Sequence, residues 1–100
     1  MCAKKISVDR LQKQAEEIRA DIKHLEQVED VLDEARGELE HELRRAGDAL
    51  VRAGGRSWDV ENRIKELKGN IALNRKDLEE NKKQRQEFET HLKNIEQELS

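Results

Sequence analysis

The chain has 100 residues, of which 34% are hydrophobic, 2% are aromatic and 43% are charged. So few apolar side chains exclude a large compact core, and this composition is typical of long helices that bury a narrow apolar seam. The formal charge of −3 arises from 20 basic and 23 acidic residues interspersed along the chain, which excludes the basic stripe of a nucleic-acid-binding surface.

A first helix is predicted over residues 7–53, after a flexible N-terminus at residues 1–6. Ser7 supplies a hydroxyl N-cap, and Asp9 places an acid in the first turn. From Val8 onward, mostly apolar residues recur at alternating steps of three and four, which predicts one uninterrupted heptad seam. The seam consists of Val8, Leu11, Ala15, Ile18, Ile22, Leu25, Glu29, Leu32, Arg36, Leu39, Leu43, Ala46, Leu50 and Ala53.

A turn is predicted at residues 54–57, and a second helix over residues 58–99. Gly54 or Gly55 can adopt the left-handed conformation that ends a helix, and Ser57 can cap the helix that follows. The absence of proline leaves both helices uninterrupted. The second seam consists of Val60, Ile64, Leu67, Ile71, Asn74, Leu78, Asn81, Arg85, Phe88, Leu92, Ile95 and Leu99.

The short turn predicts that the two helices lie antiparallel. Their seams then pair layer by layer, from Leu50 with Val60 at the turn to Leu11 with Leu99 near the termini. This register places an acid-rich segment, residues 26–42, beside a base-rich segment, residues 68–84, and opposite charges favour it over a slipped register. The predicted fold class is all-α: a long antiparallel two-helix hairpin (coiled coil) that dimerises into a four-helix bundle.

A second apolar stripe predicts where the hairpin meets a partner. A hairpin with one narrow seam is marginally stable alone, and a face in contact with water would not need further apolar residues. We predict that a protein partner, preferably a second copy and otherwise a helical hetero-partner, contacts Val28, Val31, Ala35, Ala72 and Leu73. A domain-swapped dimer, in which the Gly54-Gly55 hinge opens, uses the same seams and stays an alternative.

Polar residues interrupt both seams near their middle. In coiled coils such residues cost stability and commonly fix register or oligomeric state. We predict a hydrogen-bonded polar layer that comprises Glu29, Arg36, Asn74, Asn81 and Arg85. A catalytic pocket is the alternative, but two helices provide no cleft that excludes water.

Trp58, the only tryptophan, is the first residue of the predicted second helix and lies outside the seam. We predict that it covers the open end of the bundle by packing near Leu50 or Val51. The alternative is an exposed aromatic anchor for a partner, since such anchors are common binding hot spots.

No residue pattern predicts catalysis, a metal site or a cofactor. In this register none of His24, His41 and His91 has a second good ligand beside it, whereas zinc requires three or four, and no Ser/His/Asp or Cys/His arrangement is present. The single Cys2 is interpreted as a free thiol at a frayed terminus. The predicted function is that of a non-enzymatic protein–protein interaction or scaffolding module, which acts through coiled-coil self-association or helix-in-groove binding.

The expected location is cytoplasmic. No apolar stretch approaches the roughly 20 residues that span a bilayer, and the sequence lacks the apolar region of a signal peptide. Export by a route other than Sec stays open.

The predicted hairpin, with Trp58 beside its turn, resembles the Trp-x-Gly family of small secreted hairpins that ESX-type systems export. Val60 occupies the Gly position of that motif, and the chain has no Tyr for the C-terminal Tyr-x-x-x-acid signal of the family. The long helices also resemble those of prefoldin subunits, which are holdase chaperones, although prefoldins insert β-hairpins where this chain has a short turn. These resemblances imply, as alternatives, a small secreted hairpin or a chaperone-like adaptor that holds a partner helix.

Overall fold

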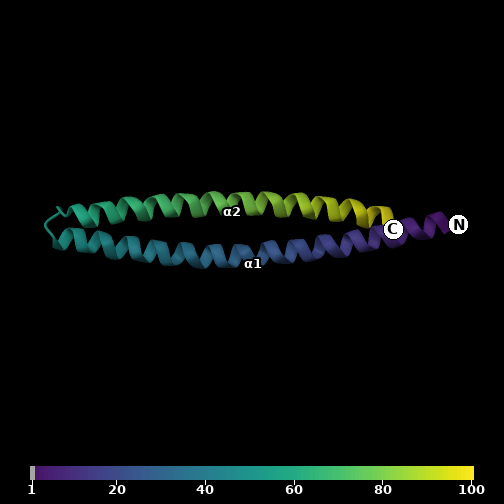
Figure 1. Cartoon of the computed structure of the whole chain (residues 1–100), viewed down its shortest axis with the longest axis horizontal. Coiled ribbons are helices and arrows are strands. Elements are labelled where there is room, and N and C mark those ends of the chain that lie inside the picture. The colour runs from purple at the N-terminus through teal and green to yellow at the C-terminus, as the bar shows by residue number, and fades with distance from the viewer. Residues whose placement is uncertain (1) are drawn as a thin grey trace. The chain divides into compact units, whose positions relative to one another are not determined.

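A computed structural model describes the backbone of residues 2–100 and the side chains of residues 7–100. Over this range the chain is an all-α helical hairpin, in which α1 (Cys2–Arg52) and α2 (Trp58–Leu99) are joined by a turn (Figure 1). The predicted class, an all-α two-helix hairpin, is confirmed. Within residues 2–100, neither helix contains a stretch that is long and apolar enough to span a membrane.

The helix bounds differ from the predicted ones at α1. This helix begins at Cys2 and ends at Arg52, so the segment at residues 2–6, predicted to be flexible, has a helical backbone. Ala and Lys are strong helix formers, and Ala3, Lys4 and Lys5 therefore extend the helix beyond the predicted cap at Ser7. The Cys2 thiol lies outside the described side chains.

The turn is built from backbone hydrogen bonds and two glycines. The Gly55 N–H donates to the Leu50 carbonyl at 2.9 Å and the Gly54 N–H donates to the Val51 carbonyl at 3.0 Å, the bonding pattern of a Schellman motif. Gly54 and Gly55 have φ values of 74° and 79°, a region that disfavours residues with a Cβ. Ser57 then caps α2, because its Oγ accepts from the Val60 N–H at 3.4 Å.

The residues form two compact units, and in each a segment of α1 lies antiparallel to a segment of α2. We call Asp30–Glu79 the turn unit, and Met1–Glu29 with Glu80–Ser100 the terminal unit. The core of the terminal unit comprises buried Ala15, Ile18 and Ile95, with Leu11, Ile22, Phe88, Leu92 and Leu99 packed against them.

The core of the turn unit lies mainly on α2. Leu67, Ile71 and Leu78 are buried there. Asn74, the seam residue between Ile71 and Leu78, is buried as well. The seam residues of α1 that the register places opposite them are only half-buried: Leu32, Arg36, Leu39 and Leu43. In the turn unit, α1 therefore leaves part of its apolar seam open to solvent.

Candidate interaction surfaces

The polar residues of the turn-unit seam do not bond to one another. Asn74 is 7% exposed, and its Nδ2 donates to the Leu32 carbonyl of α1 at 3.0 Å. Arg36 pairs instead with carboxylates of its own helix, with its Nη2 at 3.3 Å from Asp33 Oδ1 and its Nε at 4.0 Å from Glu40 Oε1. The long Arg36 side chain is 39% exposed, so it reaches the helix surface and leaves Asn74 to a backbone partner.

In the terminal unit, Glu29 of α1 and Arg85 of α2 form an ion pair between side chains that are 19% and 26% exposed. Arg85 also approaches Glu89, with its Nε 3.8 Å from Oε1. Asn81, which the register places opposite Glu29, is buried without a partner for its Oδ1. Arg85 thus reaches Glu29 from the next layer of the seam.

Two buried carbonyl oxygens, Asn74 Oδ1 and Asn81 Oδ1, have no hydrogen-bond partner among the described residues. Each unpaired buried acceptor costs about 1–3 kcal/mol. Polar seam residues lower stability, but they penalise registers in which they would face apolar side chains. Both asparagines are therefore consistent with a role in fixing the pairing of the helices.

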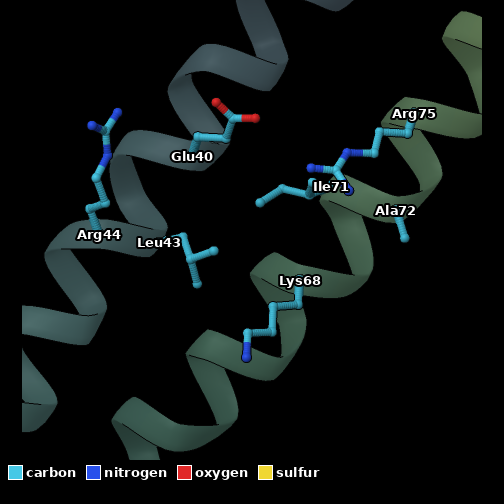
Figure 2. Close-up of a pocket in the computed structure, with 7 residues that line it drawn as sticks. All are labelled: Glu40, Leu43, Arg44, Lys68, Ile71, Ala72 and Arg75. Atoms are coloured by element: carbon cyan, nitrogen blue, oxygen red, sulfur yellow. The ribbon is translucent and has the colours of Figure 1, made fainter.

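A groove of about 570 Å³ runs along one side of the turn unit. In Figure 2, Leu43 of α1 and Ile71 of α2 point toward one another at its floor, while Arg44 points away from α2. The complete lining comprises Glu40, Leu43, Arg44, Lys68, Ile71, Ala72 and Arg75. The charged members were not predicted, although Glu40, Lys68 and Arg75 lie at the heptad position that commonly carries the flanking charges of a helix pair; Arg44 lies farther from the neighbouring helix.

The cations of the groove are unpaired. Among residues 7–100, none of Arg44, Lys68 and Arg75 forms an ion pair within 4.0 Å. Glu40 is the only acid in the lining, and it lies beside Arg36. The groove thus combines an apolar floor with an excess of positive charge.

The predicted partner stripe is divided by the structure. Val31 and Leu73 are 65% and 60% exposed, and Ala35 is half-buried, but none of them lines the groove. Ala72 is exposed and does line it. Val28 belongs to the terminal unit, where it is half-buried on α1.

Helical periodicity explains this division. Arg63 of α2 bonds to Glu42 of α1 at 2.6 Å, and Glu66 lies 3.4 Å from Arg63. Ala35 precedes Glu42 by two turns, and Leu73 follows Glu66 by two turns, so both lie on this side of the turn unit. We call this side the Arg63 flank, and the opposite side the groove flank. Successive helical residues point about 100° apart. The adjacent residues Ala72 and Leu73 therefore lie on different flanks.

Trp58 does not cover the end of the helix pair. Trp58 and Val51 are each 77% exposed. Side chains lean toward the N-terminus of their helix, so a residue at the first position of α2 leans toward the turn and away from Leu50. Val51 follows Arg44 by two turns of α1, and Trp58 precedes Ala72 by four turns of α2, which places both on the groove flank.

The histidines His24, His41 and His91 are exposed. Within the described residues, no three side chains of His, Cys, Asp or Glu come together in a group that could hold a metal ion. The apolar features exposed among the described residues are the groove floor, Val31 with Leu73, and Val51 with Trp58 beside the turn.

Comparison with models of protein families, with curated proteins and with solved structures finds no match. The fold and these surfaces define the class as a two-helix hairpin whose flanks differ in charge and apolar content.

Proposed function

We propose that the chain is a non-enzymatic protein–protein interaction module that self-associates, with two hairpins combining into a four-helix bundle. The observation that carries this proposal is the incomplete burial of α1. Six hydrophobic residues are buried among the described side chains, and none of them lies on α1 between Ile18 and the turn.

A second layer of helices would cover what the hairpin leaves open. Two helices bury only the narrow stripe along which they touch, and most helical stability in proteins comes from packing an apolar face. In a four-helix bundle each helix packs against two neighbours, so half-buried residues such as Leu39, Leu43 and Leu50 gain a second set of contacts. A scaffold of this kind needs no cofactor or catalytic group.

The test is the mass of the purified chain in solution. Size-exclusion chromatography with light scattering, over a concentration series and with circular dichroism on the same samples, should give a dimer that dissociates on dilution and loses helicity as it does so. A fully helical monomer at every concentration would contradict self-association, because the hairpin would then need no second layer.

A second candidate function, an adaptor that holds a partner's amphipathic helix, is favoured by the exposed Val31 and Leu73. They lie among acids, since Glu38, Glu42 and Glu66 occupy the same side of the turn unit. A Leu- and Lys-rich amphipathic model peptide should therefore bind the chain, and Val31→Ser with Leu73→Ser should weaken that binding. Equal binding to both proteins, or none to either, would remove this candidate.

A further inference from the structure

Opposite charges predominate on the two edges of the groove in the turn unit, although Arg44 is a cation on the α1 edge. On the α1 edge, Glu40 lines the groove and Asp33 lies two turns before it; their side chains are 44% and 47% exposed and share one cation, Arg36. On the α2 edge, Lys68 and Arg75 pair with no acid among residues 7–100. The edges therefore attract each other but do not meet across the apolar floor.

A second copy of the chain can place opposite charges against both edges of the groove at once. If the copy is rotated by half a turn about an axis parallel to the helices, the α1 edge of each copy lies over the α2 edge of the other. Every acidic edge then faces a basic edge. The opposite orientation, with the turns at opposite ends, would place α1 over α1 and acid over acid, and like charges at close range reject a wrong pairing.

The register of the turn unit shows which residues would meet. The register predicted from the seam places Leu39 opposite Ile71, and the cross-helix contacts Glu42–Arg63 and Leu32–Asn74 join the same stretches of the two helices. A copy rotated about the helix direction keeps these levels, so Arg75 comes between Asp33 and Glu40 of the second copy, and Lys68 comes beside Glu40.

Small residues permit the two copies to approach. At the same levels, Ala72 comes opposite Gly37 of the second copy. A Cβ added at Gly37 would meet no atom within 4 Å, so the space above it is open in the single chain. Small residues at such positions allow helix backbones to come close.

The exposed apolar residues beside the turn fit the same arrangement. Val51 and Trp58, each 77% exposed, lie at nearly the same level on the groove flank. With both turns at one end, Trp58 comes against Val51 of the second copy, and the pair is repeated by symmetry. The arrangement thus covers, with each other, the two most exposed of the large apolar side chains among the described residues.

We propose that the groove flank binds the groove flank of a second copy, with the two turns at the same end. This inference rests on the proposed self-association and specifies its surface and orientation. Lys68 and Arg75 are the cations that select it, and Asp33 and Glu40 are their partners.

The test uses two complementary charge reversals. Lys68→Glu with Arg75→Glu makes both edges acidic, and Asp33→Lys with Glu40→Lys makes both edges basic. Each variant should raise the Kd of its own dimer by about 10–100-fold, whereas a mixture of the two should form a 1:1 heterodimer. Lys76→Glu with Lys83→Glu is the matched control, because it makes the same change in charge outside the groove lining and should leave the Kd within about 3-fold.

Arg44 separates a second copy from an acidic hetero-partner. In the proposed dimer Arg44 lies level with Lys65 of the second copy, so Arg44→Glu should tighten self-association by about 3–10-fold. A groove built for an acidic peptide would lose affinity on the same substitution. Weaker self-association of this variant would overturn the proposed surface.

The orientation is tested at the turn. In a Cys2→Ser, Arg56→Cys variant, mild oxidation should link two chains turn to turn, and the reversal Lys68→Glu with Arg75→Glu should abolish the link. Absence of this cross-link in a dimeric variant would overturn the shared-end arrangement.

Failure of the two proposals can be told apart. If the wild-type chain is monomeric, self-association and the surface are both wrong. If it is dimeric but the reversed variants dimerise as the wild type does, or do not combine when mixed, the surface is wrong and self-association stands.

Discussion

Asn74 provides a quantitative test of how the seam of the turn unit is stabilised. The Asn74 side chain is 7% exposed. Its Nδ2 donates a hydrogen bond to the Leu32 carbonyl, and its Oδ1 has no hydrogen-bond partner. Replacing it by Leu converts the interruption into one more apolar layer between Ile71 and Leu78. We expect Asn74→Leu to raise the free energy of unfolding.

The magnitude follows from four contributions, two that stabilise the variant and two that destabilise it. Removing the unpaired buried acceptor gains about 1–3 kcal/mol, and losing the hydrogen bond to Leu32 costs about 0.5–1.5 kcal/mol. Burying a Leu side chain gains about 1.5–3 kcal/mol, from which fitting a larger, branched side chain subtracts about 1–3 kcal/mol. The expected net stabilisation is about 1–3 kcal/mol.

Urea unfolding followed by circular dichroism measures this change. With a slope of about 1–3 kcal/mol per molar urea, the midpoint should rise by about 1 M at a fixed protein concentration. Asn70→Leu, a change of the same type at an exposed position one turn earlier, should leave the midpoint nearly unchanged. A lower midpoint for Asn74→Leu would refute the reasoning. The single hydrogen bond from Asn74 Nδ2 to the Leu32 carbonyl would then contribute more to stability than apolar burial of Leu and removal of the unpaired oxygen together.

Three further predictions concern other parts of the hairpin. Arg85→Met should lower the free energy of unfolding by about 1–3 kcal/mol, because Glu29 keeps its charge in a mostly buried position; adding Glu29→Met should recover most of the loss in the same urea assay. Gly55→Ala should lower the free energy of unfolding by about 1–2 kcal/mol because the φ of Gly55 is 79°. Gly69→Ala should raise it by up to about 1 kcal/mol, since an added Cβ meets no atom within 4 Å. Thermal melts in parallel compare the two variants, and an unchanged melting temperature for Gly55→Ala would contradict the turn geometry. Trp58 should emit as a water-exposed indole at low concentration and shift to shorter wavelength as the chain dimerises; an emission maximum independent of concentration would argue against its burial in the dimer.

The heptad pattern predicted the helix faces well because periodicity alone decides which residues face the neighbouring helix. Every seam residue of α2 from Val60 to Leu99 is buried or half-buried, and the turn has the glycines and the Ser57 cap that the sequence indicated. At the ends of the first predicted seam the pattern was less informative, because Val8 and Ala53, which directly follows α1, are exposed. Beyond the last layer there is no facing helix to bury them.

The partners of the polar side chains could not be read from the same pattern. Arg36 has enough length to reach Asp33 and Glu40 on its own helix, and the choice between these acids and Asn74 depends on rotamers and solvent. Ala72 and Leu73 are adjacent in sequence but occupy different heptad positions, and only Ala72 lines the groove. The prediction of one continuous stripe therefore did not indicate the groove. Trp58 was predicted to pack near Leu50 or Val51, with an exposed anchor as the alternative; its side chain is 77% exposed, because side chains at a helix start lean away from Leu50.

The capped turn also bears on the order in which the hairpin folds. The cross-helix contact nearest the turn, Glu42–Arg63, joins residues 21 apart, whereas Arg19–Glu96 joins residues 77 apart. Closing a loop costs more entropy as the loop lengthens, by about 0.6 kcal/mol per doubling. The pairing that is cheapest to form therefore adjoins Gly54 and Gly55, and each layer formed there shortens the loop that the next layer must close. Folding is expected to proceed like a zipper from the turn toward the termini, so that substitutions at the two glycines slow folding, while substitutions in the Ala15, Ile18 and Ile95 core chiefly speed unfolding.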